Sequence, residues 1–215
     1  MAIRKNTALQ KKLTEIYDKL FQVYGLCQCP LDYETPFQLL VAVVLSAQCT
    51  DIRVNIVTKE LFAKYGTVEK FAAAKVEDIA QIIKSVGLYQ TKSRNLHAAS
   101  LILRDKFQGV VPMDMDDLLS LPGVGRKSAN AIRGNAFNIP GFPADTHVQR
   151  LLMRLGIIKE RNPELAEDVV CRNLPEEYWT NFSHLLIFHG RAVCHARTPE
   201  CGRCVLNSIC KGAEL

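Results

Sequence analysis

The chain has 215 residues, of which 48% are hydrophobic and 23% charged, and its formal net charge is +5. This composition is typical of a globular protein with a sizeable core, arranged as one large domain or two small ones. No apolar run approaches the roughly 18 residues of a membrane-spanning helix, and the first residues lack the pattern of a secretory signal. We therefore expect a cytoplasmic protein.

Charged residues are unevenly distributed along the chain. Residues 84–106 hold five basic side chains and one acidic one, and residues 121–137 hold three basic side chains and no acidic one. Acidic side chains gather in residues 164–177. Such a separation suits a DNA-binding protein, but two ordinary solvated helix faces would give the same pattern.

Hydrophobic spacing predicts helices almost throughout and no convincing pair of strands, so the fold should be all-α. Thr35 and Pro36 open a helix over residues 37–45 that is apolar nearly all round and should be buried at the centre of the fold. The other expected helices run through residues 9–20, from Thr50 or Asp51, over 68–73, over 76–84, from after Gly87 to about Phe107, and from Asn162 and Pro175.

The segment Leu-Pro-Gly-Val-Gly-Arg-Lys-Ser-Ala, residues 121–129, is the most informative in the chain. Its glycines permit a tight turn that leads directly into a helix. Amide groups at Gly123, Val124, Gly125 and Arg126 would then form a site suited to a phosphate. This is the pattern of a helix–hairpin–helix element, here about residues 112–137, although a plain glycine turn before a helix looks similar.

Lys127 and Asp145 are the candidates for chemistry. The helix N-terminus and Arg126 disfavour the charged form of Lys127, as partial burial would, and an uncharged lysine can form a Schiff base. Asp145 opens another helix as its N-cap, and such a carboxylate can also stabilise positive charge on a sugar. Taken alone, Lys127 could equally be a phosphate contact and Asp145 only a cap.

Four of the eight cysteines crowd near the C-terminus with the spacing C-x6-C-x2-C-x5-C: Cys194, Cys201, Cys204 and Cys210. In a cytoplasmic protein such crowding indicates a metal site before disulfides. Four thiolates suit a [4Fe–4S] cluster or structural zinc. The single C-x-x-C with longer flanks favours the cluster and leaves zinc as an alternative.

Together these segments resemble the endonuclease III family of helix–hairpin–helix DNA glycosylases over nearly the whole chain. The resemblance rests on residues 45–51 (Leu-Ser-Ala-Gln-Cys-Thr-Asp), Gly87-Leu-Tyr, residues 121–129, Asp145-Thr-His, His189-Gly-Arg and the four cysteines. It implies a six-helix barrel domain over 29–139, and a cluster domain made from both chain ends, 1–28 and 140–215. It also implies a [4Fe–4S] cofactor with a structural role.

The resemblance implies a base-excision-repair glycosylase and AP lyase, acting as a monomer on double-stranded DNA with damaged bases or abasic sites, near the nucleoid if the source is bacterial. Lys127 would be the nucleophile and Asp145 its activating carboxylate. Gln48 would fill the place of the extruded base and Leu88 would wedge the opposite strand. The further DNA contacts implied are Gly123, Val124, Gly125, Arg126, His147, Arg191 and Arg197.

The presence of Lys127 favours a bifunctional enzyme acting on oxidised pyrimidines, because the related mismatch adenine glycosylases lack a lysine there. A monofunctional mismatch glycosylase and a non-catalytic DNA-binding module are the alternatives. Ala144 and Thr198 replace a valine and a lysine that are usual in the family. Cys27 and Cys29 have no functional interpretation.

Overall fold

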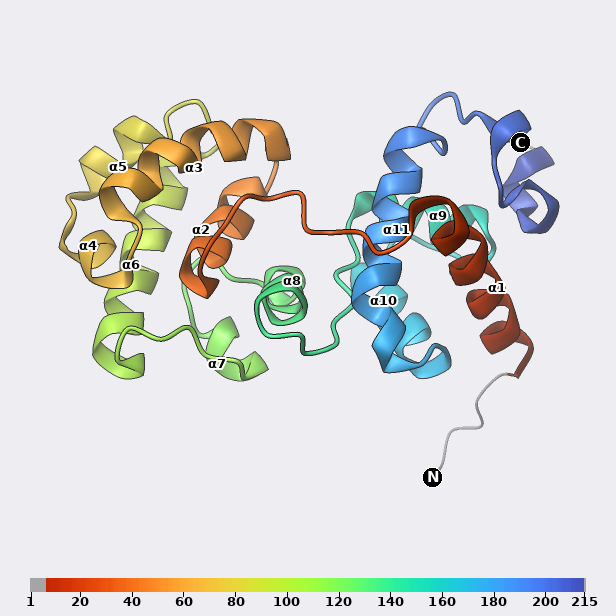
Figure 1. Ribbon diagram of the computed structural model, residues 1–215, viewed down its shortest axis with the longest axis horizontal. Helices are drawn as coiled ribbons and strands as arrows, with labels where there is room; N and C mark the ends of the chain where they lie inside the picture. Colours follow the sequence, from red (N-terminus) through yellow and green to blue (C-terminus); the bar gives the residue numbers. More distant parts are fainter. Residues whose placement is uncertain (1–6, 215) are drawn as a thin grey trace. The chain divides into compact units, whose positions relative to one another are not determined.

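The computed structural model describes residues 7–214 and contains helices and no strand within that range (Figure 1). This part of the chain divides into two compact units. Residues 29–139 form the first, the central unit, and residues 7–28 with 140–214 form the second, the terminal unit. No helix in the described range is both long and apolar enough to cross a membrane.

The central unit contains α2 (Pro36–Ser46), α3 (Asp51–Tyr65), α4 (Val68–Ala73), α5 (Val76–Ile82), α6 (Tyr89–Phe107), α7 (Met115–Leu119) and α8 (Arg126–Ala136). The terminal unit contains α1 (Thr7–Tyr24), α9 (Thr146–Arg154), α10 (Pro163–Asn173), α11 (Trp179–Ala192) and the single-turn 3₁₀ helices η1 (Glu176–Tyr178), η2 (Cys201–Arg203), η3 (Asn207–Ile209) and η4 (Lys211–Glu214).

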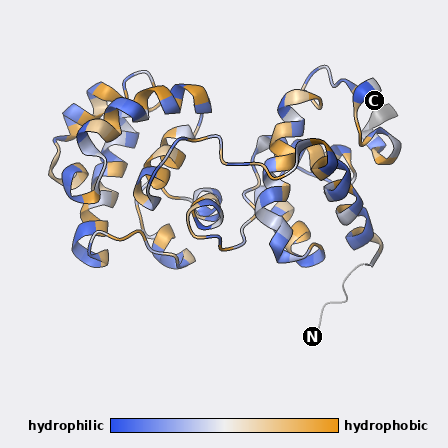
Figure 2. Ribbon diagram, in the orientation of Figure 1, coloured by the Kyte–Doolittle hydropathy of each residue, from blue (hydrophilic) through white to orange (hydrophobic). Residues whose placement is uncertain are grey.

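Helix α2 is the core of the central unit. Every residue from Phe37 to Leu45 is buried, as the apolar run predicts, and α2 packs against α3, α6 and α8. The side chain of Thr35 accepts a hydrogen bond from the Gln38 N–H and so begins the helix where the sequence predicts. The helices around α2 carry apolar residues on one face and polar residues on another (Figure 2), which is how a surface helix buries one side.

The terminal unit is built from segments that are far apart in the sequence. Helix α1 packs against α10 and α11, and α9 packs against α11. Leu13 and Ile16 from α1 share one fully buried core with Phe142 and Phe182. Segments from both ends of the chain thus contribute to a single hydrophobic core.

Most predicted helix limits are confirmed, and two differ: the helix expected over 76–84 ends at Ile82, and the one expected from Pro175 begins differently. Thr50 caps α3 and Asn162 caps α10, while α4 covers residues 68–73 and α6 ends at Phe107, as expected. Pro175 does not open a long α-helix. It precedes the single turn η1, and α11 begins only at Trp179.

Candidate functional site

The glycine turn before α8 has a shape that only certain residues allow. Gly123 has a φ of +87°, and a Cβ atom there would lie 3.2 Å from the Cβ of Asn95. The Val124 N–H donates to the Leu121 carbonyl at 3.0 Å and closes the turn, and Gly125 immediately precedes the helix. The first N–H groups of a helix have no acceptor within it. The turn therefore offers amide donors at the positive end of α8, where an anion is stabilised.

Lys127 and Asp145 lie at the N-terminal ends of two helices, one in each unit. Lys127 lies in the first turn of α8, and its side chain is exposed, so burial adds nothing to the effects of the helix N-terminus and Arg126. The buried face of this helix belongs instead to residues such as Ala129 and Ile132. Asp145 is the N-cap of α9, as predicted, and its Oδ1 accepts a hydrogen bond of 2.8 Å from the Val148 N–H.

Gln48 and Leu88 occupy two unusual turns of the central unit. Their φ angles are +55° and +59°, a left-handed conformation that is disfavoured for residues with a side chain. Gln48 follows the end of α2, and Leu88 immediately precedes α6. Both side chains are exposed, and Leu88 keeps 61% of its surface accessible. Leu88 is therefore not part of the hydrophobic core of the central unit.

His147 belongs to a partly buried polar group that links α9 to α11. Its Nδ1 lies 3.1 Å from Nη2 of Arg150, and the same guanidinium donates to the carbonyls of Gly190 and Cys194. A Cβ on Gly190 would lie 3.1 Å from both Arg150 Nη2 and His147 Nδ1. The glycine of the His-Gly-Arg segment is thus needed for close helix packing. Burial lowers the pKa of His147, against the opposing effect of Asp145.

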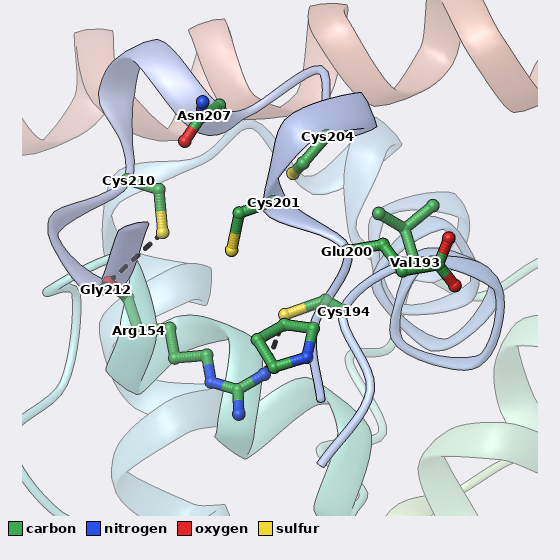
Figure 3. A pocket seen from close by; sticks show the side chains of 10 residues that line it. Arg154, Val193, Cys194, Glu200, Cys201, Cys204, Asn207, Cys210 and Gly212 are labelled. Carbon is green, nitrogen blue, oxygen red and sulfur yellow. Dashed lines mark hydrogen bonds between the residues drawn. The ribbon is translucent and has the colours of Figure 1, made fainter. Parts of the chain in front are cut away.

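The four cysteines of the C-terminal segment line one open pocket, with their sulfur atoms turned toward a common space beside Arg154 (Figure 3). Cys194 follows α11, and Cys201, Cys204 and Cys210 lie in or beside η2 and η3. The four sulfurs thus share one space, and four thiolates suit either a [4Fe–4S] cluster or a zinc ion.

Two side chains next to this pocket lie within hydrogen-bonding distance of cysteine sulfur atoms. Nη1 of Arg154 donates to the Cys194 Sγ at 3.1 Å, and Nε2 of His189 lies 3.2 Å from the Cys204 Sγ. Burial raises the pKa of the Cys204 thiol, and the other three cysteines add to the effect. Thiolates this close together need positive charge from bound metal. Iron would supply it, so the donor set fits a [4Fe–4S] cluster.

Sequence reasoning missed Arg150, Arg154, His189 and Lys92. Arg150 and Arg154 are one helical turn apart on α9, and this spacing is a signal that could have marked them as one contact face. His189 was noticed only as part of a motif. Nothing in the sequence distinguishes Lys92 from exposed lysines, although it is only 5% exposed.

The remaining predicted DNA contacts differ in exposure. Arg126, Arg191 and Arg197 are exposed, whereas His147 is half-buried and Val124 is buried. Any contact made through Val124 would therefore involve its backbone rather than its side chain. Arg126 and Val124 belong to the central unit, and the other three belong to the terminal unit.

Two family models match the chain. Residues 41–175 match the HhH-GPD superfamily base excision DNA repair proteins, and residues 194–210 match the iron-sulfur binding domain of endonuclease III. The second match contains all four cysteines, so Cys194, Cys201, Cys204 and Cys210 hold the [4Fe–4S] cluster.

Curated relatives and solved structures agree with these matches. Endonuclease III of Synechocystis sp. is 44% identical over 99% of this chain and 97% of its own length, and that of Bacillus subtilis is 43% identical over 95% and 94%. A non-covalent endonuclease III–DNA complex is 40% identical, with a TM-score of 0.91 over 95% of this chain and 96% of that one. The chain belongs to the endonuclease III family, the bifunctional glycosylases and AP lyases of base excision repair.

Proposed function

We propose that this enzyme excises oxidised pyrimidines of the thymine-glycol type from double-stranded DNA and cleaves the resulting abasic site, with Lys127 as nucleophile and Asp145 as its carboxylate partner. It would act as a monomer in the cytoplasm, at the nucleoid in a bacterium. One observation carries the proposal: an exposed lysine in the first turn of α8, directly behind the glycine turn. A relative that is 40% identical has been trapped as an endonuclease III–DNA covalent intermediate.

The first step is displacement of the damaged base. The amine of Lys127 attacks C1′ of the sugar, and the bond from C1′ to the base breaks, so that the base leaves with the bonding electrons and is protonated. The nitrogen loses protons as the sugar ring opens, which gives an imine between Lys127 and C1′. This attack requires an accessible, unprotonated amine, and the exposed position of Lys127 provides the access.

Asp145 supports this step electrostatically. Its Oδ1 is held by the Val148 N–H, which fixes the carboxylate at the start of α9. The cap leaves Oδ2 for the reaction, where it can accept a proton from the lysine and stabilise positive charge on the sugar as the base departs. One residue can therefore serve as helix cap and catalytic carboxylate together.

The second step breaks the DNA strand. The imine makes the C2′ proton acidic; once this proton is removed, the bond from C3′ to oxygen breaks and the 3′ phosphate leaves with the electron pair. Water then hydrolyses the imine and frees Lys127. The elimination needs no further oxidant or reductant, which agrees with a structural role for the cluster.

DNA binding would use both units. In the central unit, the amides at Gly123, Val124 and Gly125 and the side chain of Arg126 would hold backbone phosphates without reading sequence. In the terminal unit, His147, Arg191 and Arg197 would add contacts. When bound by the four cysteines, the cluster would hold together the segment from Cys194 to Cys210, which contains Arg197, and so would limit the movement of the Arg197 side chain.

Base extrusion would use the two left-handed turns. The damaged nucleotide must leave the stack before C1′ can be reached. Gln48 would occupy the vacated place, and Leu88 would enter beside the opposite strand as an apolar wedge. Their support is the exposure of both side chains on strained backbone, which is a feature of functional sites.

Borohydride trapping on an oligonucleotide with one abasic site tests the nucleophile. Wild-type enzyme should form a covalent adduct, and Lys127→Ala should form none. Lys64→Ala, which changes an exposed lysine of α3, is the matched control and should trap like wild type. An undiminished adduct from Lys127→Ala would refute the assignment.

A lesion panel tests the substrate class. We expect release and strand cleavage with thymine glycol, and no activity on an A·G mismatch. Release of adenine without cleavage would instead indicate a monofunctional mismatch glycosylase. Binding without either reaction would indicate a non-catalytic DNA-binding module.

A further inference from the structure

One buried cation of the central unit has no part in the chemistry above. Lys92 lies on α6 and is only 5% exposed, and its Nζ donates to the carbonyl oxygens of Leu45 at 2.9 Å and Ala47 at 2.5 Å. Burial lowers the pKa of this lysine. A buried ammonium group is unfavourable unless it is well partnered, and the two carbonyl oxygens supply that partnership here.

The two acceptors lie at the C-terminus of α2. Carbonyls in the last turn of a helix have no partner within it and carry partial negative charge. Lys92 thus caps α2 from a different helix. The Ala47 carbonyl belongs to the peptide plane that joins Ala47 to Gln48, whose φ is +55°. Holding that oxygen fixes the orientation from which the left-handed turn at Gln48 starts.

Lys92 is also bonded to the second left-handed turn. Its backbone N–H donates to the carbonyl of Leu88 at 3.0 Å, in the first turn of α6. The two turns are neighbours, because a Cβ on Gly87 would lie 3.6 Å from the carbonyl oxygen of Gln48. A single residue therefore contacts the end of the helix before Gln48 and the start of the helix after Leu88.

We propose that Lys92 is a positioning residue, which sets the spacing between Gln48 and Leu88 by tying the C-terminus of α2 to the N-terminus of α6. The inference rests on the proposed entry of these two side chains into DNA. Without the ammonium, the Gln48 turn is free to relax, and the pair no longer fits the space on either side of an extruded base. Chemistry at a site that has already lost its base depends less on this fit.

Lys92→Met tests the proposal, because methionine keeps an unbranched apolar side chain and removes the donor group. Single-turnover rates are measured on a thymine-glycol duplex and on a duplex with a preformed abasic site. We expect excision to fall by about tenfold to a hundredfold, the size of effect seen for small misplacements, and abasic cleavage to change by less than about threefold.

A double variant shows whether Lys92 acts through Gln48. Gln48→Ala alone should slow excision, and Lys92→Met should add little in the Gln48→Ala background, because the residue that it positions is already absent. Fully additive effects would overturn the proposal. An equal fall of both rates in Lys92→Met would overturn it as well.

Leu103→Ala is the matched control for lost stability, since Leu103 is a fully buried residue of the same helix. If it lowers the thermal midpoint as Lys92→Met does and gives the same difference between substrates, the positioning role is wrong. Should Lys92→Met not fold, Lys92→Gln keeps a donor on a shorter side chain. Lys92→Gln should slow excision more than abasic cleavage, but by less than Lys92→Met does. Equal effects of Lys92→Gln on the two rates would refute the proposal.

Failure of the proposed function would look different. If the wild-type enzyme were inactive on both duplexes, the proposed glycosylase and lyase activities would be contradicted. If Gln48→Ala left the excision rate unchanged, the proposed role of Gln48 in base extrusion would be contradicted. Neither result depends on Lys92.

Discussion

The core around α2 and the C-terminal cysteine segment are held together in different ways. Leu39, Leu40 and Leu45 of α2 are fully buried, and each such side chain contributes roughly 1.5–3 kcal/mol by leaving water. Between residues 193 and 212, all within the described range, only Val193 and Leu206 are buried hydrophobic residues. The first region folds by apolar packing, and the second depends on its metal ligands and the side chains that bind its carbonyl groups.

Loss of the cluster should have the largest effect on local structure. This effect should be confined to the C-terminal cysteine segment and should not reach the core around α2. In Cys201→Ala, the visible absorption and iron content should be lost, and the amides of residues 194–212 should lose hydrogen-exchange protection. The amides of α2 should remain protected, because apolar burial holds them. Hydrogen exchange read by mass spectrometry, segment by segment, measures both.

Cys171→Ala is the control for this experiment, since Cys171 is half-buried and lies outside the pocket. It should keep iron and protection alike. Retained protection of residues 194–212 after iron is lost would show that the segment is ordered without its cluster.

A cavity in the core around α2 should cause the next largest loss, which is a loss in the free energy of unfolding. Leu40→Ala should lower the free energy of unfolding by about 2–5 kcal/mol, while the cluster absorption per folded chain stays unchanged. Ile52→Ala, which changes a side chain that is 78% exposed on α3, is the control and should cost less than about 0.5 kcal/mol. Equal losses in a denaturant titration would contradict the account of this core.

The two glycines of the turn before α8 should respond differently to an added methyl group. Gly123→Ala is strained at φ +87° and crowded by Asn95, so it should cost about 1–3 kcal/mol. Gly125→Ala meets no atom within 4 Å and has an ordinary φ of −97°, so its stability should be near wild type. Denaturant titrations of the pair measure this, and similar losses would argue against the turn geometry.

The smallest effect concerns pH and the terminal unit. Burial lowers the pKa of His184 below its ordinary 6.5, so the folded protein resists a proton that the unfolded chain accepts. Neutral His184 makes its full contribution to the free energy of unfolding above about pH 6.5. This contribution is lost as the pH falls toward the lowered pKa of His184 in the folded protein. His184→Gln should therefore show a smaller drop in thermal midpoint between about pH 7.5 and about pH 5.5. An identical drop in both proteins would assign the effect elsewhere.

The sequence predicted what depends on local pattern. The helix over residues 37–45, the caps at Thr35 and Asp145, and the cluster segment follow from apolar spacing, capping chemistry and cysteine spacing. It could not give the exposure of Lys127, which depends on which face of α8 packs inward. Nor could it give the burial of Lys92, because its partners are carbonyls more than forty positions away.

The two-ended construction of the terminal unit constrains the order in which the protein is made. The central unit is a continuous stretch of chain with a hydrophobic core of its own, so it can fold while the chain is still emerging from the ribosome. Helix α1 is synthesised first but packs against α10 and α11, which are made last. The apolar face of α1 therefore stays without its partners until most of the chain has been synthesised.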